Sequence, residues 1–216
     1  MNAESPIRVA GTAVVLRDGR AGLESLLLRR PASGSFAGAW VFPGGRVDPG
    51  DTAEGMGEAD AARNAAVRET AEEAGIRIGD LTLFSRWVPP EETPVKFRTW
   101  FFLARDLGDR VRSNPGEIEE AAWMTPQAAF AGHADGSIML FPPTWVTLHA
   151  LREYRTVDDA LAAVREPAYF TTRMGTEERV PLAIWGGDEA HADEPGPPGA
   201  RHRLWMGEPP WRYERS

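Results

Sequence analysis

Residues 68–76 read Arg-Glu-Thr-Ala-Glu-Glu-Ala-Gly-Ile and hold three carboxylates that lie three and four positions apart. In a helix this spacing stacks Glu69, Glu72 and Glu73 on one face, because residues three and four apart are neighbours on a helix surface. Like charges crowded in this way repel one another. A divalent cation relieves the repulsion, since hard cations such as Mg²⁺ prefer oxygen ligands. The stretch therefore predicts a helix with a carboxylate face that binds a cation.

The same helix needs a start, an end and an inner face. Gly75 stands where helices commonly end, and Asp60 is suited to cap the first turn. We expect the side opposite the carboxylates to pack on the rest of the protein, and it carries Val67, Thr70, Ala71 and Ala74. The alternative for the carboxylates is a solvated acidic face, because glutamate is a good helix former.

A glycine pair lies upstream, in Phe42-Pro43-Gly44-Gly45. Together, the glycine pair and the acidic stretch resemble the Nudix box, G-x5-E-x7-R-E-U-x-E-E-x-G-U, in which U is a bulky apolar residue. The likeness runs over residues 45–76 and is closest from Arg68 to Ile76, with Thr70 at the first U position. It implies the Nudix fold, an α/β/α sandwich with a mixed sheet, and a pyrophosphohydrolase that uses Mg²⁺ or Mn²⁺.

The first half of the box departs from the family spacing. Between Gly45 and Arg68 the chain has 22 residues, whereas the pattern has 13. Counted forward from Gly45, the glutamate position of the box holds Asp51; counted back from Arg68, it holds Asp60. We therefore expect an insertion within residues 51–60, a stretch that is rich in glycine and acidic residues.

The resemblance gives each charged residue of the box a role in catalysis. Glu69, Glu72 and Glu73 are expected to bind the metal ion, and one of them to help activate the attacking water. Arg68 is expected to pair with a box carboxylate and hold it in orientation. An ordinary surface position is the alternative for this arginine.

A fourth metal ligand often comes from outside the box in this family. The run Glu117-Ile118-Glu119-Glu120 lies where such a residue is expected. Glu117 is the first candidate and Glu120 the second, and an exposed acidic loop is the alternative for both.

The substrate is expected to meet the end of a strand and the glycine pair. Arg29 or Arg30 would bind a phosphate, but not both, because successive strand residues point to opposite faces. Gly44 and Gly45 would let the backbone approach the metal and the phosphates, since neither carries a Cβ.

Four further segments are similar to the Nudix branch that contains the peroxisomal coenzyme A diphosphatase: residues 26–30, 36–38, 41–48 and 141–144. The implied substrate is a nucleoside diphosphate linked to another moiety, such as coenzyme A. ADP-ribose, dinucleoside polyphosphates and nucleotide sugars stay open. A different class is a non-catalytic nucleotide-binding or regulatory module, because fold does not fix function. Retention of all three box glutamates favours the enzyme.

Composition limits the partners and the compartment. The net charge of −8 argues against binding to nucleic acid or to an anionic membrane surface, which requires a basic face. The chain has no cysteine, which excludes disulfides and Cys₄ zinc sites. No apolar run approaches the roughly 18 residues that a membrane span needs. We expect a soluble cytoplasmic protein whose partner is a nucleotide-type small molecule.

The order of patterns along the chain predicts an α/β protein, and the resemblance implies a Nudix core over residues 1–140 with a C-terminal extension over 141–216. Aromatic and apolar residues of the extension, Trp145, Leu148 and Leu151, would pack on the core or form a homodimer contact. Residues 188–201 are rich in proline, glycine and acids and predict a surface loop or local disorder. Apolar runs predict strands at residues 9–17, 25–30, 81–88, 97–104, 121–124, 180–185 and 203–205, and helical spacing at 145–154 and 157–164. Thr125-Pro126 predicts the start of a short helix.

Overall fold

The computed structural model describes residues 7–34 and 36–216. None of the helices in these ranges is long and apolar enough to cross a membrane. In chain order the elements are β1 (Arg8–Gly19), β2 (Gly22–Arg29), β3 (Trp40–Val41), β4 (Gly44–Arg46), the 3₁₀ turn η1 (Pro49–Asp51), α1 (Glu58–Ala74), β5 (Ile78–Val88), β6 (Phe97–Asp106), β7 (Glu120–Met124), α2 (Pro126–Asp135), α3 (Pro142–Leu151), α4 (Val157–Ala163), β8 (Ala168–Thr171), β9 (Arg173–Glu177), β10 (Val180–Ile184), β11 (His202–Trp205) and β12 (Arg212–Arg215).

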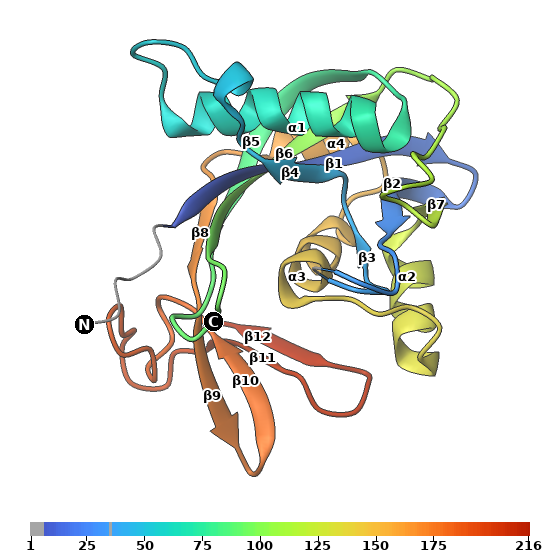
Figure 1. Cartoon of the computed structure of the whole chain (residues 1–216). Helices are drawn as coiled ribbons and strands as arrows, with labels where there is room; N and C mark the ends of the chain where they lie inside the picture. The colour runs from blue at the N-terminus through green and yellow to red at the C-terminus, as the bar shows by residue number, and fades with distance from the viewer. Residues whose placement is uncertain (1–6, 35) are drawn as a thin grey trace.

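The larger of two sheets has eight strands in the order β3-β2-β1-β6-β5-β8, with β4 paired to β1 and β7 paired to β2. It is mixed, because β1 pairs with β6 and β5 with β8 in parallel, whereas the remaining pairs are antiparallel. Helix α1 lies across one face, and α2 and α3 lie on the other side (Figure 1). This arrangement confirms the predicted α/β fold with a mixed sheet.

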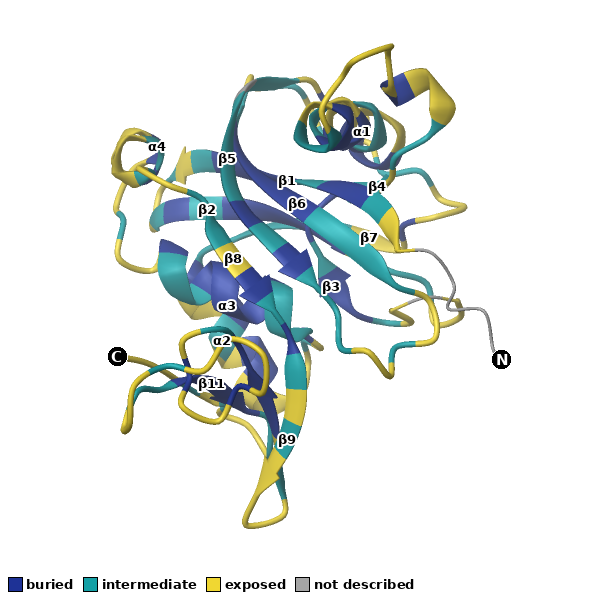
Figure 2. Cartoon of the chain, turned by 90° about the vertical axis from the view of Figure 1, so that its left-hand side faces the viewer, coloured by how far each residue is buried: buried dark blue, intermediate teal, exposed yellow. Residues whose placement is uncertain are grey.

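The central strands are buried on both faces, and Figure 2 shows them dark along most of their length. Val15 packs with Ala62 of α1, whereas Val14 packs in a separate cluster with Trp145 and Leu148 of α3. Residues 100–103 in β6 are at most 9% exposed. A run of apolar residues without alternation is typical of such a strand.

Helix α1 packs on the sheet through small side chains. A Cβ added to Gly11 of β1 would lie only 1.8 Å from the carbonyl oxygen of Ala62, so strand and helix nearly touch through their backbones. Val67 is 43% exposed and Glu73 only 2%. The predicted inner face is therefore wrong for Val67 and Ala71, because the close approach selects a face of small residues and turns Glu73 inward. The buried residues of α1 are Ala61, Ala62, Ala65, Ala66, Thr70, Glu73 and Ala74.

The insertion lengthens α1 at its N-terminal end. The helix begins at Glu58, and its N-cap is Gly57, three residues before the predicted cap at Asp60. The inserted residues thus form the exposed loop 52–57 and extra turns of helix. The predicted end is confirmed, since Gly75 follows Ala74 with φ of 66° and its N–H bonds the Ala71 carbonyl.

The helices after β7 begin where proline is tolerated. The predicted helix start at Thr125-Pro126 is confirmed, and the Thr125 side chain caps α2 by accepting a hydrogen bond from the Ala128 N–H. Helix α3 starts at Pro142, three residues before the prediction, because proline suits the first helical turn. Its residues Trp145 and Leu148 are buried in the core, so they are not free to form a homodimer contact.

Among the C-terminal strands, β10 and β11 confirm the strands predicted at 180–185 and 203–205, whereas β8, β9 and β12 have no counterpart among the predicted strands. Strand β8 extends the large sheet beside β5, and β12-β11-β10-β9 form a second sheet. The loop between β10 and β11 is ordered by its own contacts, because Asp188 and His191 are buried and Asp188 pairs with Arg203. The prediction of a surface loop over 188–201 is therefore wrong for these residues. The division of the chain at residue 140 stays a prediction.

Candidate active site

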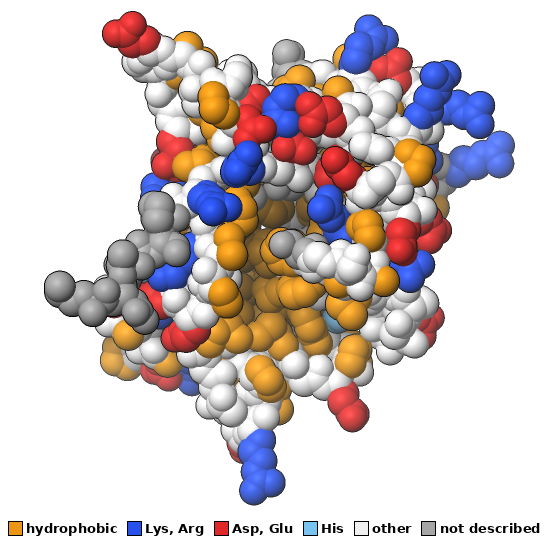
Figure 3. All heavy atoms as spheres, viewed as in Figure 1, with side chains coloured by type: hydrophobic (Ala, Val, Ile, Leu, Met, Phe, Trp, Pro, Cys, Tyr) orange, Lys and Arg blue, Asp and Glu red, His pale blue; other side chains and the backbone are white. Residues whose placement is uncertain are grey.

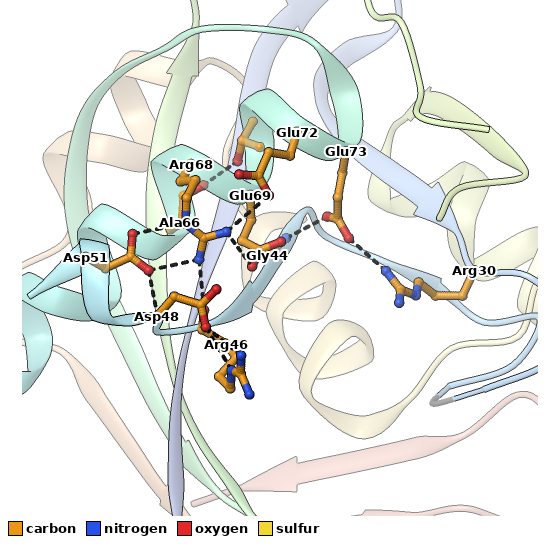
Figure 4. Close-up of polar contacts among 11 residues, drawn as sticks. Arg30, Gly44, Arg46, Asp48, Asp51, Ala66, Arg68, Glu69, Glu72 and Glu73 are labelled. Carbon is orange, nitrogen blue, oxygen red and sulfur yellow. Dashed lines mark hydrogen bonds and ion pairs between the residues drawn. The ribbon is translucent and has the colours of Figure 1, made fainter. Parts of the chain in front are cut away.

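Glu73 is the most buried of the three box glutamates. Its Oε1 accepts a 2.7 Å hydrogen bond from Arg30 Nη1, and its Oε2 accepts a 3.0 Å bond from the Gly44 N–H. These contacts join the last turn of α1 to the end of β2 and the start of β4 (Figure 4). Burial raises the pKa of Glu73 to about 7, although the Gly44 N–H and the Arg30 charge act in the opposite direction.

Arg68 lies between Asp51 and two of the box glutamates. Its Nε and Nη2 donate to the two carboxylate oxygens of Asp51 at 3.1 and 2.8 Å, a bidentate geometry that suits arginine. Its Nη1 donates to Glu69 at 3.0 Å and to Glu72 at 3.1 Å. These hydrogen bonds lower the pKa of Asp51 and raise the pKa of Arg68. Arg68 is thus in contact with box carboxylates, as an orienting role requires.

The structure distinguishes the two aspartates that compete for the glutamate position of the box. Asp51 is buried in the 3₁₀ turn, where its Oδ2 also accepts a 2.8 Å bond from the Asp48 N–H. Asp60 is exposed on the first turn of α1. Counting forward from Gly45 therefore identifies the aspartate that contacts Arg68, and the insertion follows it. The sequence contained this signal, because the loop between the glycine pair and Asp51 keeps the family length.

The glycine pair lies against the box carboxylates. A Cβ added to Gly45 would lie 2.3 Å from Cδ of Glu69, and one added to Gly44 would lie 2.4 Å from the Gly11 carbonyl oxygen. Position 44 therefore requires glycine, whereas a Cβ at position 45 would displace the Glu69 carboxylate. Burial raises the pKa of Glu69, and the charges of Glu72 and Glu117 add to this effect. The structure places the glycines in contact with carboxylates, a function that the sequence patterns did not reveal.

A loop before β7 brings Glu117 to the site. The N–H groups of Arg112 and Asn114 bond the carbonyls of Ala74 and Glu73 at 2.8 and 3.0 Å, which satisfies two acceptors at the end of α1. The charge of Glu117 contributes to the raised pKa of both Glu69 and Glu73, so it lies near them. This position favours Glu117 as the fourth carboxylate.

The two predicted phosphate-binding arginines point to different partners. Arg29 forms long ion pairs with Glu119 at 3.7 Å and Glu120 at 3.9 Å, away from the box helix. Arg30 instead contacts Glu73. The expectation that only one of the pair faces the site agrees with this arrangement, and Arg30 is that residue.

The carboxylates of the site are suitable ligands for a divalent ion, but the structure does not arrange them as a metal site. Within residues 7–34 and 36–216, no three Asp, Glu or His side chains are arranged to hold a metal ion. Nevertheless, the negative charge of Glu69 disfavours ionisation of the buried Glu73, and burial raises the pKa of both carboxylates. A cation would remove that cost, and carboxylate oxygens are ligands that Mg²⁺ and Mn²⁺ prefer. Arg68 and Arg30 supply the positive charge in the structure as it stands.

The charged group borders a hollow. In the space-filling view, acidic and basic side chains gather over α1, and a depression lined by hydrophobic side chains opens directly below them (Figure 3). A polar centre next to an apolar recess is typical of a small-molecule site.

The chain was compared with protein families and with solved structures. The family model for the NUDIX domain matches residues 7–141. No curated protein matches the chain in sequence. A NUDIX hydrolase from Alicyclobacillus acidocaldarius is 26% identical and has a TM-score of 0.66, with 75% of this chain and 98% of that chain covered.

Two more distant structures share the fold. A MutT NUDIX hydrolase from Burkholderia pseudomallei is 24% identical, with a TM-score of 0.52 and coverage of 67% of this chain and 98% of that chain. The NUDIX domain of Shewanella oneidensis NrtR, solved with ADP ribose, is 15% identical, with a TM-score of 0.53 and coverage of 69% and 88%.

Proposed function

The chain belongs to the Nudix family of pyrophosphohydrolases, and we propose that it is a metal-dependent hydrolase for nucleoside diphosphates joined to another moiety. The observation that carries this proposal is the convergence of Glu69 and Glu73 on the backbone of the glycine pair, with Arg30 beside them. Cleavage of a diphosphate requires neutralisation of its phosphoryl oxygens and a positioned water. Arg30 would neutralise phosphoryl charge directly, and Glu69 and Glu73 would do so through the cation that they bind.

Each residue has a task that follows from its contacts. We propose that Glu69, Glu72, Glu73 and Glu117 hold Mg²⁺ or Mn²⁺. The ion would supply charge neutralisation and a lower pKa for the attacking water. Arg30, once freed from Glu73, would bind a substrate phosphate through its planar guanidinium. Asp51 fixes Arg68 on its other side.

The substrate class is proposed more broadly than a single compound. Coenzyme A is a candidate because residues 26–30, 36–38, 41–48 and 141–144 resemble the coenzyme A diphosphatase branch. ADP-ribose, dinucleoside polyphosphates and nucleotide sugars also contain the diphosphate group that the site would bind. The net charge of −8 supports a small nucleotide rather than a nucleic acid as substrate.

A hydrolysis panel tests the proposal. Wild-type protein, Glu73→Gln and Glu54→Gln would each receive Mg²⁺, then Mn²⁺, with coenzyme A, ADP-ribose, a dinucleoside polyphosphate and a nucleotide sugar. Glu54 is exposed in the loop before α1 and serves as a matched control. We expect metal-dependent cleavage of at least one compound, a loss of about a hundredfold or more in Glu73→Gln, and no change in Glu54→Gln.

Two results would contradict the proposal. Full activity of Glu73→Gln would remove this residue from the essential set. Absence of turnover, together with saturable binding of one compound in a thermal-shift titration, would instead support the non-catalytic nucleotide-binding module.

A further inference from the structure

We propose that a second cavity, remote in sequence from the box, binds a small molecule with an apolar body and one carboxylate. The cavity has a volume of about 410 Å³ and lies between β5 and β8 on one side and α3, α4 and β12 on the other. Ligand cavities commonly fall between about 300 and 1,000 Å³. None of its lining residues belongs to residues 44–76, and Arg30 and Glu117 are also absent from it. The inference therefore does not depend on the proposed hydrolase activity.

The walls of the cavity are aromatic. Trp87 and Phe170 stack face to face with ring centroids 3.8 Å apart, and both rings line the space together with Phe84 and Tyr213. Trp87 and Phe170 are buried among the core residues of the sheet face opposite α1. Because apolar surface of this kind gains free energy when water leaves it, the inner part of the cavity suits an apolar or aromatic body.

One buried polar group in the wall has no partner. The Thr147 side chain lies on α3 and is 1% exposed, and its Oγ1 forms no hydrogen bond with the described part of the chain. A buried hydroxyl without a partner costs about 1–3 kcal/mol. Since Thr147 lines the cavity, a ligand oxygen that enters it can accept this hydroxyl's hydrogen bond.

The mouth of the cavity is positively charged. Arg165 and Arg215 line it and are exposed, and neither forms an ion pair with any residue that the structure describes. Glu166 is the acidic residue in the lining, so the charged side chains there sum to +1. His149 is wedged between the rings of Trp145 and Tyr213, at 5.3 and 5.0 Å between centroids, and burial lowers its pKa, which keeps it neutral.

The arrangement of aromatic walls inside the cavity and two arginines at its mouth indicates the kind of ligand that fits. An apolar body would lie against the Trp87 and Phe170 rings, and a terminal carboxylate would reach the guanidinium groups of the two arginines, which bind carboxylates in a bidentate manner. A neutral molecule of the same shape would fill the walls but leave the two arginines without an anion. We therefore expect selectivity for the acid over the corresponding alcohol.

Isothermal titration calorimetry on the full chain tests this selectivity. The probes are 3-phenylpropanoate and 3-phenylpropan-1-ol, which differ in the charged group, and the buffer contains EDTA so that no metal enters the box. We expect saturable binding of the acid, at least about tenfold tighter than the alcohol. Arg215→Gln should weaken the acid several-fold and leave the alcohol unchanged, whereas Arg179→Gln, an exposed residue outside the lining, should change neither.

Two further variants locate the binding. Ala150→Trp adds volume to the cavity wall and should abolish binding of both probes; Thr147→Val keeps the shape and should weaken the acid a few-fold. Thermal unfolding of each variant checks that it is folded. If Ala150→Trp does not fold, the affinity of Thr147→Val for the acid tests the proposal. Absence of saturable binding, equal affinity for acid and alcohol, or binding that is indifferent to these substitutions would overturn the proposal.

Discussion

Two buried carboxylates, Glu73 on the box helix and Asp188 beside the C-terminal sheet, are held in opposite ways. Burial would raise the pKa of Asp188, but hydrogen bonds from Arg203 and from the backbone N–H groups of His202 and Ala190 lower it to about 2. Glu73 has one arginine contact and one backbone donor, and its pKa is raised to about 7. The fully partnered carboxylate stabilises the fold; the incompletely partnered one retains the capacity to bind something else.

The largest expected effect comes from breaking the structural carboxylate. Asp188→Asn would leave Arg203, whose side chain is 6% exposed, with only the 3.3 Å pair to the half-exposed Glu177, and we expect a loss of about 3–5 kcal/mol in the free energy of unfolding. Asp193→Asn is the control, because its pair with Arg173 is half exposed and contributes less than about 1 kcal/mol. Urea unfolding measures both. A loss below 1 kcal/mol in Asp188→Asn would show that the C-terminal pair contributes little.

Next comes the packing that holds the box helix. Gly11→Ala would drive its Cβ into the Ala62 carbonyl, which is backbone and cannot rotate away, so we expect a loss of about 3 kcal/mol. Gly50→Ala is the matched control, because a Cβ there meets no atom within 4 Å, and it should stay within about 0.5 kcal/mol. Equal stability of the two variants in urea would contradict the close contact of α1 and β1.

The pH dependence of stability should separate the two carboxylates. The pKa of folded Glu73 is raised from 4.5 to about 7, so its contribution is present below pH 4.5 and is lost as the pH rises through 7, about 3 kcal/mol in all. The pKa of folded Asp188 is lowered from 3.8 to about 2, so its contribution is present above pH 3.8 and is lost as the pH falls toward 2, about 2 kcal/mol.

Unfolding in EDTA across pH 2 to 8 measures both limbs of this curve. Glu73→Gln should flatten the limb between pH 4.5 and 7, and Asp188→Asn should flatten the limb below pH 4. If both variants show the wild-type dependence of stability on pH, the two carboxylates do not contribute to stability in the way described.

The smallest expected effect concerns the orientation of the box. Asp51→Asn would remove one charged partner of Arg68, and we expect kcat to fall about tenfold while KM changes little. Asp51→Glu should retain most of the activity, because it keeps the charge. Asp60→Asn tests the competing alignment and should have wild-type kinetics, since Asp60 is exposed. A larger effect at Asp60 than at Asp51 would reverse the assignment.

The sequence predicted the box better than its surroundings because the box depends on local spacing. The helix end follows from the preference of glycine for that position, here Gly75. The shared face of the box glutamates and the opposite directions of Arg29 and Arg30 follow from helix and strand periodicity. The burial of Glu73 could not be predicted in this way. It depends on how α1 is rotated, and a glycine on a distant strand, Gly11, sets that rotation.

Three of the five C-terminal strands were missed for a different reason. Strands β8, β9 and β12 have four or five residues each, and their burial does not alternate in a simple way. Their order comes from pairing with distant strands, as in β5 with β8, and from long-range contacts such as Asp188 with Arg203. The local sequence of a short strand does not show which distant strand it pairs with.

The exposed loop of residues 52–57 gives the molecule an attachment point for engineering. It follows Asp51 directly, and all six of its residues are exposed. A peptide tag or a fluorescent reporter inserted there would therefore disturb few packed side chains. Because the loop joins the aspartate that contacts Arg68 to the first turn of the box helix, a reporter inserted in it would move with the two segments that frame the candidate site. The extra length that obscured the motif therefore provides a place from which to observe it.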